Sequence, residues 1–157
     1  MNKDNKKLVL VSGGFDPLHI GHVRLLKEAK KLGNKLIVVL NNDNWLRKKK
    51  GKEFMNENER KEILEALVCV DQVIISKHSK NPKDMSISKE IIKIKPDIFA
   101  NGGDRNKKDA KNQKSSLYKD IETCKKLGIK IVYNIGKGGK IRSSSKLLKD
   151  YSKHQTI

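Results

Sequence analysis

The sequence predicts an α/β fold, a single domain built on a doubly wound parallel sheet of five strands. Three observations lead to this fold class. The chain has 157 residues, which is the length of one domain. Short, β-branched apolar runs alternate with segments in which apolar residues recur at helical spacing. Glycine-containing turns follow several of these runs, and open α/β sheets bind ligands at the carboxyl ends of their strands.

The first apolar run, the turn after it and the next helix begin a βαβ unit. Residues 8–11 form a short run that predicts a buried strand, and residues 23–32 have the spacing of a helix. Gly33 and Asn34 end that helix, and residues 35–41 form a second apolar run. A strand, a helix and a strand within about 35 residues favour parallel strands with a right-handed crossover.

The later segments repeat this alternation and complete a Rossmann-like sheet. Asn56 is a good N-cap with Glu59 three residues later, and Gly128 is a good residue to end a helix. We expect helices at residues 56–67, 86–95, 116–127 and 146–149, strands at 70–75, 98–100 and 129–133, and a polar connection at 76–85 with His78 exposed. The domain is expected to span residues 7–150, between a disordered basic N-terminus (1–6) and a frayed C-terminal tail (151–157).

The chain is strongly basic, with a net charge of +18. This charge indicates either a surface for nucleic acid or anionic membranes, or a lysine-rich composition on solvated faces. Only five of the 36 basic residues are Arg, and the lysines are scattered through all segments, which favours the second interpretation. Aromatic residues do not interleave with the lysines as they do in proteins that stack on single strands. We therefore expect no nucleic-acid and no membrane partner.

Apolar runs and cysteines point to a cytoplasmic protein. No run approaches the roughly 18 apolar residues of a membrane span, and the apolar run after the basic start of the chain is too short for a signal peptide. Cys69 and Cys124 lie in unrelated segments without metal-ligand spacing, which fits a reducing compartment.

The turn at residues 12–22 carries the clearest chemical signal. Gly13 and Gly14 let a bulky anion approach the backbone, and the helix start behind them offers N–H groups and the positive end of a dipole. His19 and His22 are three residues apart, so both imidazoles point to one side of a helical turn, with Gly21 leaving space between them. The alternative is a glycine turn with two surface histidines. The combination predicts a phosphate site.

Residues 14–22, Gly-Phe-Asp-Pro-Leu-His-Ile-Gly-His, resemble the signature of the cytidylyltransferase-like nucleotidyltransferases. This family includes glycerol-3-phosphate cytidylyltransferase and the adenylyltransferase domain of ADP-heptose synthase. The resemblance implies transfer of a nucleoside monophosphate from ATP or CTP to a phosphorylated small molecule, such as a sugar or polyol phosphate, with release of pyrophosphate. It also implies Mg²⁺ held mainly by the triphosphate, with no metal site made of protein ligands alone, and a homodimer.

The resemblance continues into a basic segment after the second expected strand. This segment, residues 42–51, is expected to be a solvated loop in which Asp43 binds substrate and a lysine reaches the triphosphate. Lys50 aligns best because Gly51 follows it, and Lys49 is the rival. Arg60 falls where the family carries an arginine near the mouth of the active site; an ordinary surface arginine is the alternative.

A second glycine turn follows the fourth expected strand. Gly102, Gly103, Asp104 and Arg105 resemble the family's glycine-glycine-aspartate turn. Asp104 is expected to accept hydrogen bonds from ribose or substrate hydroxyls, and Arg105 to pair with a substrate phosphate. This turn and Lys50-Gly51 match the heptose enzymes best.

The last expected helix begins with three serines. Ser143, Ser144 and Ser145 take the hydroxyl positions of the family's closing phosphate-binding motif. The family's arginine falls at a glycine here, and Arg142 occupies an isoleucine position, so Lys140 or Arg142 supplies the charge instead. Serine-rich closing motifs also occur in the related archaeal FAD synthetases.

Together these residues define the expected site. His19 and His22, with Lys49 or Lys50, are assigned to catalysis. The nucleotide-binding residues are expected to be Gly13, Gly14, Phe15, Asp16, Gly21, Gly103, Asp104, Arg142, Ser143, Ser144 and Ser145, and the substrate-binding residues Asp43, Arg60 and Arg105. Because the three turns follow strands of one parallel sheet, they should meet at one edge. Two alternatives stay open: a fragment of a class I aminoacyl-tRNA synthetase, and a non-enzymatic nucleotide- or nucleic-acid-binding module.

Overall fold

The computed structural model describes residues 6–103, 107–136 and 142–155, apart from the side chain of Asp109. Five parallel strands form one sheet in the order β3-β2-β1-β4-β5. Their bounds are β1 Leu8–Gly13, β2 Lys35–Leu40, β3 Gln72–Ile75, β4 Ile98–Gly102 and β5 Lys130–Ile135. The sequence order reverses on either side of β1, so the sheet is doubly wound, as predicted.

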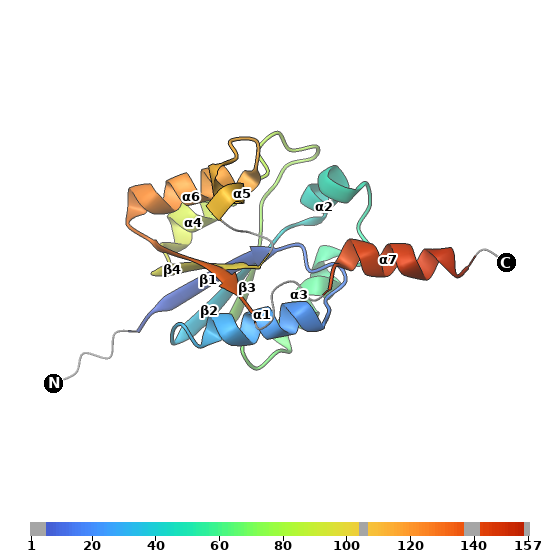
Figure 1. Cartoon of the computed structure of the whole chain (residues 1–157), viewed down its shortest axis with the longest axis horizontal. Coiled ribbons are helices and arrows are strands. Elements are labelled where there is room, and N and C mark those ends of the chain that lie inside the picture. Colours follow the sequence, from blue (N-terminus) through green and yellow to red (C-terminus); the bar gives the residue numbers. More distant parts are fainter. Residues whose placement is uncertain (1–5, 104–106, 137–141, 156–157) are drawn as a thin grey trace.

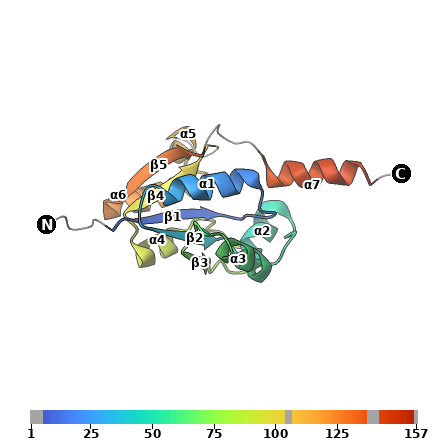
Figure 2. The same cartoon turned by 90° about the horizontal axis from the view of Figure 1, so that it is seen from below.

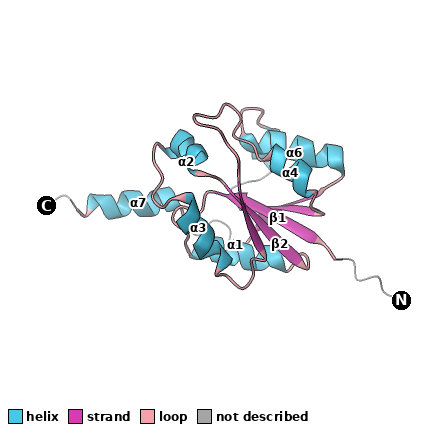
Figure 3. Cartoon of the chain, turned by 180° about the vertical axis from the view of Figure 1, so that it is seen from behind, coloured by secondary structure: helices cyan, strands magenta, loops and turns pink. Residues whose placement is uncertain are grey.

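Helices cover both faces of the sheet (Figures 1 and 2). The helices are α1 Ile20–Lys30, α2 Asp43–Lys50, α3 Glu57–Glu65, α4 Ser88–Ile94, α5 Lys107–Lys111, α6 Ser116–Leu127 and α7 Ser144–Lys153. Helices α1 and α3 lie on one face and α4 and α6 on the other, while α7 projects outward from the end of the sheet near α2 and α3 (Figure 3).

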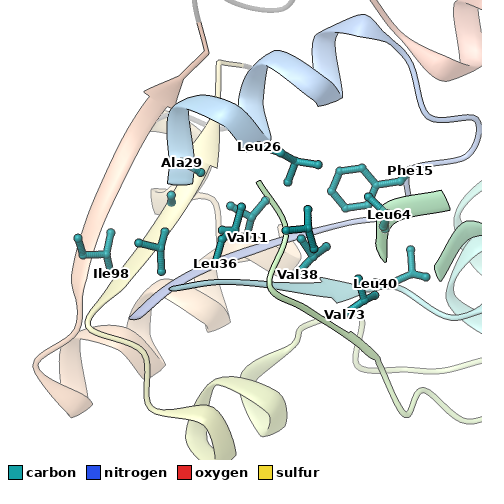
Figure 4. Packing of buried hydrophobic residues seen from close by; sticks show 13 residues of the cluster. Val11, Phe15, Leu26, Ala29, Leu36, Val38, Leu40, Leu64, Val73 and Ile98 are labelled. Atoms are coloured by element: carbon teal, nitrogen blue, oxygen red, sulfur yellow. The ribbon is translucent and has the colours of Figure 1, made fainter. Parts of the chain in front are cut away.

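Side chains alternate along the strands and so divide the apolar core in two. Val9, Val11 and Val38 face α1 and α3, where they pack with Leu26 and Leu64 (Figure 4). The opposite face carries Leu10, Val39 and Phe99 against α4 and α6, with Ile91, Leu117 and Ile121. Strands buried on both faces explain why they appear in the sequence as continuous apolar runs.

The expected loop at residues 42–51 is wrong, because most of it is helix α2. Asn42 caps the helix by accepting a 3.0 Å hydrogen bond from the Trp45 backbone N–H. Gly51 ends the helix at a φ of +88°, a conformation that suits glycine. Trp45 and Leu46 bury this helix against the domain, although its last turn is basic.

The last helix is longer than predicted. Helix α7 starts at Ser144 and continues to Lys153, so the expected boundary at residue 150 falls inside it. Among the described residues, no helix is both long and apolar enough to cross a lipid bilayer.

Candidate active site

The two histidines of the turn form the start of helix α1. His19 is the N-cap, and its Nδ1 accepts a 3.1 Å hydrogen bond from the Gly21 N–H. The Nδ1 of His22 accepts a 3.2 Å hydrogen bond from the backbone N–H of His19. The rings stack with centroids 3.7 Å apart, as their spacing predicted. A neutral imidazole that accepts at Nδ1 carries its proton on Nε2, so both rings present an N–H donor there.

Two glycines allow the close packing of this turn. A Cβ on Gly21 would lie 2.9 Å from Cε1 of His19, closer than side-chain carbons approach one another in proteins. A Cβ on Gly14 would lie 2.9 Å from a methyl carbon of Leu46, so that glycine lets helix α2 approach the end of β1. Gly14 and Gly21 therefore bring the imidazoles and helix α2 to the same turn.

Asp16 and Arg60, which were predicted to contact nucleotide and substrate, are both buried. The Asp16 carboxylate accepts hydrogen bonds from the backbone N–H groups of Phe54 (2.6 Å) and Met55 (2.8 Å). The Arg60 side chain is 1% exposed. In this structure both side chains hold the backbone around the site.

The Arg60 guanidinium connects four segments. Its Nη1 donates to the carbonyl oxygens of Gly14 (2.8 Å) and Asn41 (2.7 Å), and its Nε donates to that of Met55 (2.9 Å). Its Nη2 donates to the Asp43 carboxylate at 2.7 Å, so the predicted substrate-binding Asp43, which is partly buried, forms an ion pair with a fully buried arginine. The ends of β1 and β2, helix α2 and the segment before α3 are thereby fixed relative to one another.

The two candidate lysines lie on the exposed last turn of helix α2. Lys49 and Lys50 precede Gly51 and the segment that Asp16 holds. Arg47 and Glu53 brace this segment with two hydrogen bonds of 2.8 and 2.7 Å. The hydrogen bond from Arg47 lowers the pKa of the Glu53 carboxyl to about 2, so the pair stays ionised near neutral pH.

The serine segment lies against the histidine turn. The Ser144 hydroxyl is buried and donates a 2.9 Å hydrogen bond to the carbonyl oxygen of Pro17. Ser143 caps helix α7 through the Lys146 N–H (3.4 Å), whereas Ser145 is exposed. The Arg142 backbone nitrogen lies 3.7 Å from the Cβ position of Gly21. Two helix N-termini, those of α1 and α7, therefore lie side by side, as the predicted convergence requires.

The second glycine turn follows β4, the strand next to β1. Gly102 ends the strand and Gly103 lies in the turn after it. The candidate residues Asp104 and Arg105, and Lys140 of the closing motif, lie outside the described residues.

The polar connection after β3, expected at residues 76–85, is hydrogen-bonded to its surroundings more extensively than the sequence indicated. His78, expected to be exposed, is half-buried; its Nδ1 lies 2.7 Å from Ser76 Oγ and its Nε2 3.0 Å from the Ser86 carbonyl oxygen. Its own carbonyl accepts hydrogen bonds from the side-chain amides of Asn42 and Asn44. This segment is bound to helix α2, and no motif or periodicity in the sequence signals these contacts.

The described residues contain no group of three or more His, Cys, Asp or Glu side chains that could hold a metal ion. In the histidine turn, both Asp16 oxygens accept backbone N–H groups and each imidazole Nδ1 accepts another.

Comparisons with known proteins identify relatives of this chain. The family model described as "Cytidylyltransferase-like" matches residues 10–136. An FAD synthase of Pyrococcus horikoshii is 39% identical over 129 residues, which cover 80% of this chain and 83% of the relative. An FAD synthase of Thermococcus sibiricus is 42% identical over 108 residues, covering 68% and 69%.

Two further relatives carry other names. The bifunctional protein HldE of Pelobacter propionicus is 41% identical over 101 residues, which are 63% of this chain but only 20% of that longer protein. The solved structure of the lipopolysaccharide core biosynthesis protein from Thermoplasma volcanium superposes with a TM-score of 0.65 at 33% identity, covering 83% of this chain and 97% of that one. On the fold, the histidine turn and these matches, the chain belongs to the cytidylyltransferase-like family of nucleotidyltransferases.

Proposed function

We propose that this nucleotidyltransferase transfers AMP from Mg·ATP to the phosphate of FMN, forming FAD and releasing pyrophosphate. The FAD synthase relatives support this acceptor, because their matches extend over more than two thirds of both chains. The serine-rich start of helix α7 also supports FMN as the acceptor. The glycine-glycine-aspartate turn and the HldE match favour a sugar phosphate, which is the second candidate.

The observation that carries the proposal is the imidazole pair. Both Nδ1 atoms accept backbone hydrogen bonds, so both Nε2 atoms donate, and both lie at the positive end of helix α1. In the reaction a phosphate oxygen of the acceptor bonds to the α-phosphorus, and the bond from that phosphorus to the bridging oxygen of the β-phosphate breaks. The Nε2 donors stabilise the charge that develops on the α-phosphate oxygens.

The remaining residues position the substrates. The hydroxyls and N–H groups at the start of helix α7 hold the leaving β- and γ-phosphates, and Lys49 and Lys50 neutralise phosphate charge from the last turn of α2. Mg²⁺ enters with ATP and neutralises the triphosphate. A phosphate monoester is already nucleophilic, so the protein needs no general base.

Product analysis tests the proposal directly. Purified protein with Mg²⁺ and each of the four nucleoside triphosphates is offered FMN, glycerol 3-phosphate or a panel of sugar 1-phosphates, and pyrophosphate and products are measured. The expected result is FAD from ATP and FMN. Product from a sugar phosphate alone selects the second candidate, and the absence of product from every pair contradicts the proposal. Aminoacylation of total tRNA is assayed in parallel, with none expected.

A further inference from the structure

Three buried side-chain atoms of the described residues have no hydrogen-bond partner. They are Asn41 Oδ1, Asn101 Nδ2 and Ser86 Oγ, on residues that are 4%, 6% and 8% exposed. Buried polar atoms are nearly always hydrogen-bonded, because an unsatisfied one costs free energy. An unsatisfied buried atom therefore marks a place where a ligand or a water molecule can complete the hydrogen bonding.

The strand pattern places the two asparagines on one face of the sheet. Asn41 continues the ladder of β2, since its N–H donates to the Gly13 carbonyl at 2.9 Å. It is two residues beyond Val39, and Asn101 is two residues beyond Phe99, so both share the face of those core residues, toward α4 and α6. Both lie at the carboxyl ends of strands that flank β1.

The third atom belongs to the segment that crosses the same face. The Ser86 carbonyl accepts from His78, which follows β3, and Ile87 belongs to the core between the sheet and α4. The neighbouring Met85 carbonyl accepts a 2.9 Å hydrogen bond from the Trp45 indole of α2. All three unsatisfied atoms thus lie toward α4 and α6, at the end of the sheet that carries the active site.

The strand beside Asn101 is irregular. Between the pairs Ala100–Val132 and Gly102–Ile135, β4 has one residue and β5 has two, and the second of these, Asn134, has a φ of +56°. A bulge of this kind interrupts the ladder and is common beside active sites.

We infer that Asn41, Asn101 and Ser86 bind a neutral hydrogen-bonding group of the acceptor substrate. This inference rests on the proposed function. In-line displacement puts the attacking oxygen opposite the leaving pyrophosphate. Because the serines assigned to pyrophosphate adjoin α1, on the other face, the acceptor approaches from the α4 and α6 side. An amide oxygen, an amide N–H and a hydroxyl match a group with both a donor and an acceptor, and they do not match a phosphate.

Two kinds of acceptor carry a neutral group with both a donor and an acceptor atom, and one assay distinguishes them. In FMN the matching group is the imide edge of the ring, an N–H between two carbonyls. In a sugar phosphate it is a pair of neighbouring hydroxyls. FMN methylated at that N–H, and a deoxy sugar phosphate, each lack one of the matching atoms. The analogue of the true acceptor should show about a 5- to 10-fold higher KM with the wild-type protein, the effect of one neutral hydrogen bond.

The test compares two buried serines that lie two residues apart. Ser86→Ala removes a hydroxyl that makes no hydrogen bond of normal geometry, although it lies near the Asp84 carboxylate, whereas the control Ser88→Ala removes one that lies 3.3 Å from Asp120. Asn101→Leu replaces a side chain whose amide nitrogen has no partner by an apolar side chain of similar size. Ser86→Ala and Asn101→Leu should keep or raise the Tm and raise the acceptor KM about 5- to 10-fold. Ser88→Ala should lower the Tm and leave the acceptor KM unchanged.

The Michaelis constants and a binding titration decide the outcome. The KM for ATP should stay within about twofold of the wild-type value in all three variants, because the lost interaction weakens only the binding of the acceptor. FMN affinity, followed without ATP by flavin fluorescence, should fall in parallel with the KM change. If the wild type is active but the Ser86 and Asn101 variants keep the wild-type KM for the acceptor, or raise the KM for ATP instead, this inference is wrong and the proposed function still stands. A wild type inactive with every acceptor overturns the proposed function.

Discussion

At the scale of single residues, the histidines combine two roles. Each Nδ1 atom satisfies a backbone N–H at the start of helix α1, and this hydrogen bond also fixes the proton on Nε2. The spacing of His19 and His22 predicted that the rings share one side of the turn, and the stacked rings confirm it. No feature of the sequence indicated the capping itself, because histidine is not a preferred N-cap.

Substituting asparagine for His19 separates the two roles. The short amide of Asn is a strong N-cap, so His19→Asn should retain helix stability while removing the Nε2 donor. We expect kcat to fall about 10²- to 10³-fold, the usual cost of one transition-state donor, with little change in Tm. His19→Ala should lose both rate and Tm. Wild-type turnover in a folded His19→Asn variant would contradict the catalytic role.

At the scale of elements, a buried arginine sets how the segments around the site meet. Arg60 was predicted from its position to contact substrate, yet its partners are three carbonyl oxygens and Asp43. Three of these partners lie 17 to 46 residues away in sequence and follow no local pattern, so burial of this side chain could not be predicted. Helix α2 was missed for a related reason. Its polar composition suggested a loop, and only packing of Trp45 and Leu46 against the domain makes it a stable helix.

Removing the Arg60 charge should destabilise the whole domain. Arg60→Met leaves the Asp43 carboxylate and three carbonyls without their donor, and losing one partner of a buried pair typically costs about 3–5 kcal/mol. Urea denaturation measures this change in the free energy of unfolding. The exposed Arg24→Met is the matched control, expected to change stability by less than about 0.5 kcal/mol. A loss below about 1 kcal/mol for Arg60→Met would show that the network carries little stability.

At the scale of the whole molecule, the alternation of apolar runs was enough to predict the sheet. Strands buried on both faces and amphipathic helices leave a strong signal, so the parallel five-stranded fold is confirmed. The same reasoning predicted that the turns after the first, fourth and fifth strands meet, and the hydrogen bond between Ser144 and Pro17 joins the first and the last of these turns. The net charge of +18, by contrast, identifies neither a binding partner nor a binding surface.

The net charge should make stability and substrate binding depend on salt in opposite ways. Raising NaCl from about 20 to about 200 mM shortens the Debye length from roughly 20 to roughly 7 Å, which weakens repulsion among the lysines. The Tm should rise, while the KM for ATP should also rise as attraction of the triphosphate weakens. An uncharged osmolyte at equal osmolality is the control. A Tm that falls with salt would show that ion pairs outweigh the repulsion.

The capping role of the imidazoles has a consequence in acid. An imidazolium has no lone pair, so a proton added to Nδ1 of either ring takes away the acceptor that begins helix α1. The ring would then have to turn away from the amide it serves. Turnover and the first helical turn consequently depend on the same two lone pairs, so a change that removes one of them should disturb both.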